Sequence, residues 1–129
     1  MTGNLLETNA VLFALINDAR LSPIARDAIA SGPNFISVAS YWEVVIKSMK
    51  GKLDIGDPRL WWAQALKQLV AAPLHIRPEH IEELTGLPAI HQDPFDRILL
   101  GQAAAESLVL VTTDAQIPLY ASESLRVIF

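Results

Sequence analysis

Hydrophobic and polar positions alternate between two patterns along this chain. Short, continuous apolar runs such as Leu108–Val111 are typical of strands buried on both faces. Longer segments with apolar residues three and four positions apart, such as Asn9–Ile16, predict helices with one buried face. Because runs of the two kinds follow one another in turn, the pattern predicts a parallel sheet with helices on both faces.

Most boundaries are marked by residues that start or stop helices. A capping side chain followed by proline predicts a helix start at Ser22, Asp57 and Asp93. The expected strands are Leu5–Leu6, Phe35–Ile36, Leu74–Ile76, Leu108–Val111 and Arg126–Ile128. The expected helices are Asn9–Ile16, Pro23–Gly32, Ser37–Met49, Asp57–Ala71, Pro78–Thr85, Asp93–Glu106 and Ala115–Tyr120.

Size and composition favour one domain, residues 1–129, with one real core. Hydrophobic residues make up 51% and mean hydropathy is +0.30, which suggests that a partner covers part of the apolar surface. No apolar run reaches the ~18 residues needed to span a membrane, and we see no signal-peptide pattern. The chain has no cysteine, which excludes disulfides and thiolate zinc sites and fits a cytoplasmic location.

The net charge of −4 argues against a protein that merely coats nucleic acid, because such proteins are usually basic. An acidic chain can still cut nucleic acid where metal ions neutralise its carboxylates. The charge therefore excludes passive coating more strongly than it excludes catalysis.

Four carboxylates are expected near the carboxyl ends of strands. Glu7 and Asp114 each come just after a strand, and Glu43 and Asp96 lie in the first turns of helices. In an open parallel sheet such positions converge on one edge, so the four side chains are expected to share a crevice. Clustered carboxylates repel one another unless a cation is present. Mg²⁺ or Mn²⁺ suits oxygen ligands and would activate water for attack on phosphate.

Each carboxylate also has a purely structural explanation. Glu7, Asp93 and Asp114 can each cap the helix that follows, and Asp96 at the third helical position favours the helix dipole.

The same is true of Glu43 and of the cations after it. Ser40 with Glu43 has the spacing of a capping box, and Glu43 with Lys47 that of an i,i+4 ion pair. Two roles are open for three lysines, Lys47, Lys50 and Lys52. They bind RNA phosphates, or they are only the cations that are favoured near the C-terminus of a helix. Arg97 either contacts an RNA phosphate or forms an ion pair with Asp93, four residues earlier, and we favour the ion pair.

The sequence resembles the PIN-domain ribonucleases, and most closely the VapC-type toxins of bacterial toxin–antitoxin pairs. The matching segments occur in order along nearly the whole chain. They are Leu5–Asn9, Ser37–Glu43 with Ile46–Lys47, Gly51–Leu53, His91–Arg97 and Leu110–Asp114.

The resemblance implies a PIN-like three-layer α/β/α sandwich with a central, mostly parallel sheet. It also implies a homodimer, Mg²⁺ or Mn²⁺, endonucleolytic cleavage of RNA, and inhibition by a small antitoxin protein. The family's catalytic acids fall on Glu7, Glu43, Asp96 and Asp114, with Glu7, Asp96 and Asp114 as metal ligands. Supporting positions fall on Asp93, Thr112 and Asn9.

Glu7 departs from the family, which usually has aspartate at this position. The extra methylene moves the carboxylate by about 1.5 Å, one carbon–carbon bond. Two other functions therefore stay open. One is a PIN-fold binding module with weakened catalysis, and the other is a nuclease that acts on single-stranded DNA.

The remaining aromatic and imidazole side chains have simpler roles. Trp61 and Trp62 are adjacent, so on a helix they point about 100° apart. We expect one in the core and the other partly exposed, as part of an antitoxin interface. His75, His80 and His91 share no metal-ligand spacing and are expected to be surface or satisfied histidines.

Overall fold

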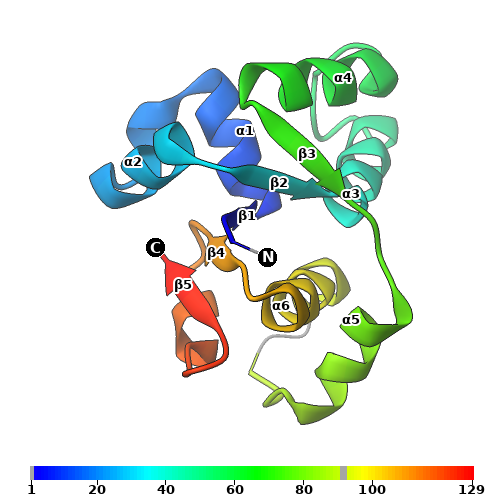
Figure 1. Ribbon diagram of the computed structural model, residues 1–129. Helices are drawn as coiled ribbons and strands as arrows, with labels where there is room; N and C mark the ends of the chain where they lie inside the picture. Colours follow the sequence, from blue (N-terminus) through cyan, green and yellow to red (C-terminus); the bar gives the residue numbers. More distant parts are fainter. Residues whose placement is uncertain (1, 91–92) are drawn as a thin grey trace.

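The fold is built on one five-stranded sheet whose strands are all parallel, in the order β3-β2-β1-β4-β5 (Figure 1). A computed structural model describes residues 2–90 and 93–129 of the chain. The strands are β1 (Asn4–Leu6), β2 (Asn34–Ser37), β3 (Ala71–Leu74), β4 (Val109–Val111) and β5 (Arg126–Ile128). The predicted parallel sheet is confirmed.

Helices connect successive strands. The α-helices are α1 (Thr8–Ile16), α2 (Pro23–Ser31), α3 (Val38–Met49), α4 (Pro58–Gln68), α5 (Pro78–Glu82) and α6 (Pro94–Glu106). Short 3₁₀ helices are η1 (Asp18–Arg20), η2 (Glu83–Gly86) and η3 (Ile117–Tyr120). The side chains of Ser22, Asp57 and Asp93 each accept a hydrogen bond from the first turn of the helix that follows, so these three predicted caps are confirmed.

Two hydrophobic cores lie on opposite faces of the sheet. Neighbouring residues of one strand point to opposite faces: Leu5 belongs to the core under α6, and Leu6 to the core shared with α1 and α4. Figure 1 shows α6 and α5 on one side of the strands and α1 and α4 on the other, which gives the expected α/β/α sandwich. Within residues 2–90 and 93–129, no helix is long and apolar enough to cross a membrane.

The boundaries around β3 differ from the sequence prediction. The helix α4 ends at Gln68, and the strand runs over Ala71–Leu74 instead of Leu74–Ile76. Pro73 lies inside this strand, although proline cannot donate a ladder hydrogen bond. Among the residues that the structure describes, β3 lies at the sheet edge and pairs only with β2, so it tolerates this proline.

Two helices also differ from their predicted form. The segment expected to be one helix over Pro78–Thr85 is divided into α5 and the 3₁₀ helix η2. The expected helix at Ala115–Tyr120 is a 3₁₀ helix that begins at Ile117. Both are short elements, for which side-chain packing outweighs the weak intrinsic preference for an α-helix.

Candidate functional site

The loops after β1 and β4 lie side by side at the carboxyl edge of the sheet. The two strands pair directly, and the backbone N–H of Glu7 donates to the carbonyl of Val111 at 2.8 Å. Glu7 therefore lies beside Thr112 and Thr113, although more than a hundred residues separate them in the chain. The loops that carry Glu7 and Asp114 therefore lie next to each other.

The Glu7 carboxylate is buried and fully engaged by the protein. It caps α1, with Oε2 accepting from the Asn9 backbone N–H at 2.7 Å. Its Oε1 accepts from the Thr112 hydroxyl and the Thr113 backbone N–H, both at 3.3 Å. Burial raises the pKa of Glu7, the hydrogen bonds lower it, and the charge of Glu43 raises it further. The predicted cap is confirmed, and Thr113 is an additional partner that its place beside Thr112 signalled.

Glu43 is the second buried carboxylate, with only 7% of the residue exposed. Its Oε2 accepts from the Lys47 ammonium at 2.8 Å, which confirms the expected i,i+4 pair. Its Oε1 is buried and has no hydrogen-bond partner among the residues that the structure describes. A buried carboxylate oxygen without a donor is costly, so this atom is suited to a cation or to water.

The capping box predicted from Ser40 and Glu43 is wrong. Helix α3 follows β2 without a loop, so Ser37 both ends the strand and caps the helix, with its hydroxyl accepting from the Ala39 N–H at 3.0 Å. Ser40 lies inside α3 and accepts from the Thr8 hydroxyl at 2.9 Å. This bond connects α1, which Glu7 caps, to α3, which carries Glu43.

A pocket of about 310 Å³ adjoins Glu43. It is lined by Lys47, Lys50, Lys52 and Asp93, together with Ile46, Pro94 and Phe95. The three predicted lysines therefore surround one cavity at the site. The cavity offers cations beside the buried carboxylate of Glu43 and the half-buried carboxylate of Asp93, a combination suited to a phosphate that approaches a metal ion.

The three aspartates lie at the ends of elements and are half-buried. Asp93 caps α6 by accepting from the Phe95 N–H at 2.9 Å, and Asp96 occupies the third position of that helix. Asp114 accepts from the Gln116 N–H at 2.9 Å, while its own N–H donates to the Thr112 hydroxyl at 3.0 Å. Thr112 thus links Asp114 to Glu7.

A divalent ion fits this donor set in part. The charge of Glu43 raises the pKa of Glu7, and the Oε1 atom of Glu43, which has no hydrogen-bond partner among the described residues, is suited to a positive ion. Within residues 2–90 and 93–129, however, no three histidine or acidic side chains are arranged to hold a metal ion. Mg²⁺ commonly binds through one or two carboxylates and keeps several waters, so a closed cage is not required. The gathering of all four carboxylates around one ion stays a prediction.

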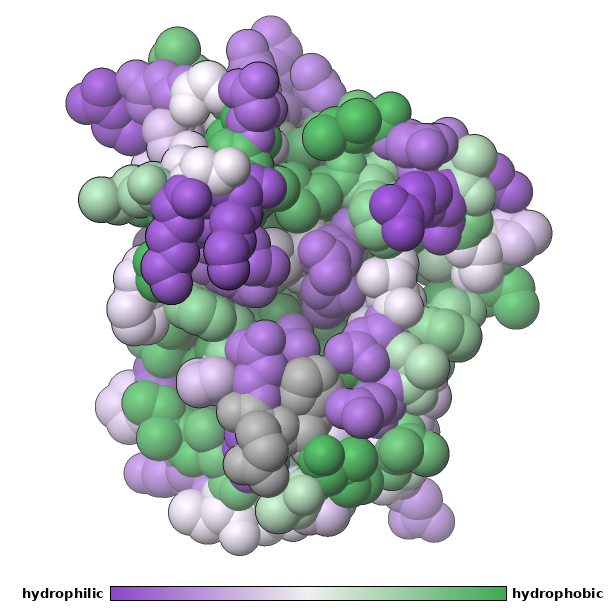
Figure 2. All heavy atoms as spheres, turned by 180° about the vertical axis from the view of Figure 1, so that it is seen from behind, coloured by the Kyte–Doolittle hydropathy of each residue, from purple (hydrophilic) through white to green (hydrophobic). Residues whose placement is uncertain are grey.

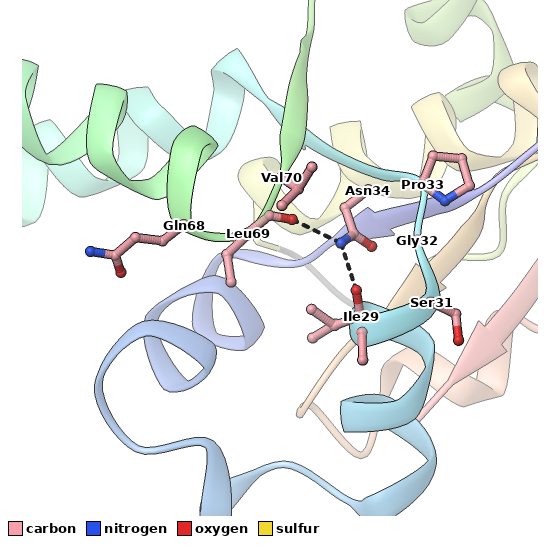
Figure 3. A pocket seen from close by; sticks show the side chains of 9 residues that line it. Ile29, Ser31, Gly32, Pro33, Asn34, Gln68, Leu69 and Val70 are labelled. Carbon is pink, nitrogen blue, oxygen red and sulfur yellow. Dashed lines mark hydrogen bonds between the residues drawn. The ribbon is translucent and has the colours of Figure 1, made fainter.

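A larger pocket lies at the opposite edge of the sheet and lacks these groups. It measures about 460 Å³ and lies among the end of α2, the start of β2 and the turn before β3 (Figure 3). Asn34 projects into this region, where its Nδ2 donates to the carbonyls of Ile29 and Leu69 at 2.8 and 3.0 Å. The Asn34 amide therefore has a structural role, and the larger volume of this pocket does not make it the candidate functional site.

The model of the family described as PIN domain matches residues 5–122. The chain belongs to the PIN domain family. The match covers Glu7, Glu43 and the three aspartates, and it includes all of β2, β3 and β4 and all of β1 except Asn4. No curated protein matches the sequence significantly.

Solved structures share the fold of this PIN domain at low sequence identity. A DNA-bound VapBC structure from Salmonella typhimurium superposes with a TM-score of 0.70 at 18% identity, covering 98% of this chain and 97% of that one. VapBC2 from Rickettsia felis, bound to a promoter DNA fragment, gives 0.67 at 16% with coverages of 98% and 97%. A toxin–antitoxin complex from Klebsiella pneumoniae gives 0.59 at 20%, with 95% and 94% covered.

The tryptophans of this PIN domain are arranged as expected. Trp61 is buried in the core, and Trp62 is half-buried and stacks on Tyr41 with ring centroids 4.7 Å apart. The sequence interpretation missed Trp42, which precedes Glu43 in the chain. Its side chain is 61% exposed and packs edge-on against the ring of Phe95. Its place in the same matching segment as Glu43 was the available signal.

Neither of the two histidines that the structure describes lines the pocket beside Glu43. His75 is exposed. His80 is fully buried between α5 and α6, where Nδ1 accepts from the Arg77 N–H at 3.0 Å and Nε2 lies 3.6 Å from the Glu106 carboxylate. His91 lies outside the described residues.

Arg97 points its guanidinium toward backbone carbonyl groups. It donates to the carbonyl oxygens of Pro88 at 3.3 Å and Leu84 at 3.5 Å. Both the ion pair with Asp93 and a role in RNA binding stay predictions.

Proposed function

We propose that this PIN domain is a metal-dependent endoribonuclease and the toxin of a toxin–antitoxin pair. The observation that carries the proposal is the pair of buried carboxylates, Glu7 and Glu43, at the carboxyl edge of the sheet. They act electrostatically on each other, one oxygen of Glu43 lacks a partner in the described structure, and lysines surround the adjoining pocket. A protein that needed these positions only for stability gains nothing from two buried like charges.

In this proposal Glu7, Asp96 and Asp114 hold Mg²⁺ or Mn²⁺, and Glu43 faces the same reaction centre. The ion, when bound, supplies charge neutralisation and Lewis acidity for hydrolysis of a phosphodiester by water. Thr112 and Thr113 hold the Glu7 carboxylate in place through three contacts. The side chain of Asp93 fixes the start of α6 and thereby positions Asp96.

The lysine-lined pocket is proposed to bind RNA. Lys50 and Lys52 attract backbone phosphates, and single-stranded RNA brings a phosphate to the carboxylates without the obstacle of a duplex groove. Water attacks the phosphorus, and the bond to the leaving ribose oxygen breaks.

The decisive experiment compares Asp96→Asn with the wild-type protein on single-stranded RNA in Mg²⁺. We expect the variant to keep its thermal midpoint and to lose cleavage by about 100-fold or more, a loss of about 2.7 kcal/mol in transition-state stabilisation. Asp27→Asn, an exposed aspartate on α2, is the control and should cleave normally. An unchanged cleavage rate in Asp96→Asn would remove that residue from the site.

Glu7 keeps a second candidate function open, a PIN-fold binding module with weakened catalysis. Both oxygens of Glu7 already accept hydrogen bonds from the protein, which favours a carboxylate committed to capping α1. Wild-type protein that neither binds Mn²⁺ nor cleaves RNA would support this second function. Cleavage of single-stranded DNA at least as fast as RNA would instead indicate a DNA nuclease.

The proposed partners are a small antitoxin protein and a second copy of this chain. Exposed apolar side chains are scattered over the molecule, including Ile16 on α1, Leu60 on α4 and Val70 in the turn after α4. Figure 2 shows one face of the molecule, where apolar and hydrophilic groups alternate around a hydrophilic middle. Trp62 remains the proposed antitoxin contact, whereas the burial of Trp61 favours a core role. Co-purification of a small protein and light scattering of the isolated chain test the two partners.

A further inference from the structure

Lys47 places a positive charge where the proposed site requires a cation. Its ammonium lies 2.8 Å from Glu43 Oε2, and its side chain is only 36% exposed. Partial burial acts to lower the pKa of Lys47, and the hydrogen bond and charge of Glu43 act to raise it, so that with the other nearby charges the pKa is raised overall. The charges of Asp93 and Glu7 act in the same direction. The Lys47 ammonium therefore contacts Glu43 directly and is also stabilised by the charges of Asp93 and Glu7.

The buried carboxylates need such a charge whenever no metal is bound. Two ionised glutamates in a site of low dielectric repel each other, and each loses most of its hydration. Lys47 offsets the charge of Glu43 through Oε2 and leaves Oε1 without a partner among the described residues. One oxygen of the Glu43 carboxylate is therefore neutralised by Lys47, and the other is left for a further positive partner.

We propose that Lys47 is a tethered counter-cation that holds Glu43 in the metal-free protein and is released from it when a divalent ion enters. The proposal rests on the proposed function. An ion near Glu7 and Glu43 is repelled by the ammonium and competes with it for the same carboxylate. The lysine stem is flexible and carries a compact charge, so the contact can open without any change in the backbone.

The neighbouring lysines allow a matched control. Lys50 lines the same pocket and carries the same charge, but the ion pair to Glu43 is made by Lys47. If net charge alone mattered, removing either lysine would change metal affinity equally. If Lys47 competes directly, its removal has the larger effect.

The test is calorimetric binding of Mn²⁺ to the full wild-type chain, Lys47→Met and Lys50→Met, each confirmed as folded by circular dichroism. We expect Lys47→Met to bind Mn²⁺ roughly fivefold more tightly than wild type, the strength of one partly exposed ion pair. Lys50→Met should stay within about twofold. The thermal midpoint of metal-free Lys47→Met should fall, and Mn²⁺ should raise it more than it raises that of wild type.

A second measurement follows the ion pair itself. Diamagnetic Mg²⁺ should shift the ¹⁵N resonance of the Lys47 ammonium, which is identified by its absence in Lys47→Met. Equal Mn²⁺ affinity in wild type and Lys47→Met, or an equal gain in Lys50→Met, would overturn the inference and leave the proposed nuclease intact. Absence of Mn²⁺ binding in all three proteins would overturn both. Binding without RNA cleavage would contradict only the proposed function.

Discussion

Glu7 is both a helix cap and a buried charge. The cap stabilises the start of α1, because Oε2 satisfies the Asn9 N–H, which has no partner within the helix. The charge opposes folding, since the carboxylate is 4% exposed and burial raises its pKa. A residue that contributes stability in one way and costs it in another is expected to respond strongly to pH.

Replacing Glu7 by Gln should flatten the pH dependence of the metal-free protein. The folded-state pKa of Glu7 is raised above its ordinary value of 4.5, so the native state holds the proton more tightly than the unfolded chain. The contribution of Glu7 to the free energy of unfolding is therefore most favourable below pH 4.5. It declines as pH rises through the folded-state pKa. Gln cannot ionise, so Glu7→Gln loses this decline.

Urea unfolding in EDTA at several pH values from 4.5 to 8 measures the effect. Glu82→Gln, an exposed glutamate on α5, is the control and should keep the wild-type pH profile. A profile for Glu7→Gln that is parallel to the wild-type profile would show that Glu7 does not titrate differently in the folded and unfolded states.

Caps were predictable at this scale where a proline follows at once, as at Ser22 and Asp57. The proline fixes the first helical position, so the residue before it is the cap. At α3 no proline marks the start, and two serines compete. Ser37 is the cap because the helix begins directly at the end of β2, in agreement with the expected helix over Ser37–Met49 and not with a capping box at Ser40. The ammonium contact of Glu43 was predictable from spacing, but its unpartnered oxygen depends on packing.

Helices α5 and α6 approach each other very closely at Gly101. A Cβ added at this glycine would lie 2.3 Å from the His80 carbonyl oxygen and 3.1 Å from a methyl carbon of Leu84. The nearest atom belongs to the backbone of α5, so it cannot rotate away. The glycine therefore sets the distance between the two helices, and α6 carries Asp96.

Gly101→Ala should lower the free energy of unfolding by about 1–3 kcal/mol, the usual cost of overpacking, despite the better helix propensity of alanine. Gly86→Ala is the matched control, because the same added carbon meets nothing within 4 Å. Urea unfolding of both variants gives the comparison. A Gly101→Ala protein as stable as Gly86→Ala would mean that α5 moves aside at little cost.

Parallel topology makes the site location predictable and its details unpredictable. Strand β1 lies at the centre of the sheet between β2 and β4, so Glu7, the start of α3 and the loop after β4 come together. Alternating strand and helix patterns were enough to predict that edge. They could not predict whether a lysine or a metal ion would neutralise Glu43, because this depends on side-chain conformation.

The whole molecule carries a net charge of −4, so the proposed binding of RNA requires a local group of cations. Lys50 and Lys52 line the pocket at the acidic site, whereas Lys67 lies in the last turn of α4 and is not part of that lining. Each phosphate contact on a single strand adds about 0.7 to the slope of log K against log salt.

The double substitution of Lys50 and Lys52 by Gln should therefore reduce that slope by about 1.4 and weaken binding at low salt. Lys67→Gln, which removes one positive charge outside the pocket, should leave the slope within error of the parent. Fluorescence anisotropy with a labelled single-stranded RNA, in an Asp96→Asn background to prevent cleavage, measures both. If the double substitution left the slope unchanged, RNA would have to approach the carboxylates over a different surface, and these lysines would only stabilise the end of α3.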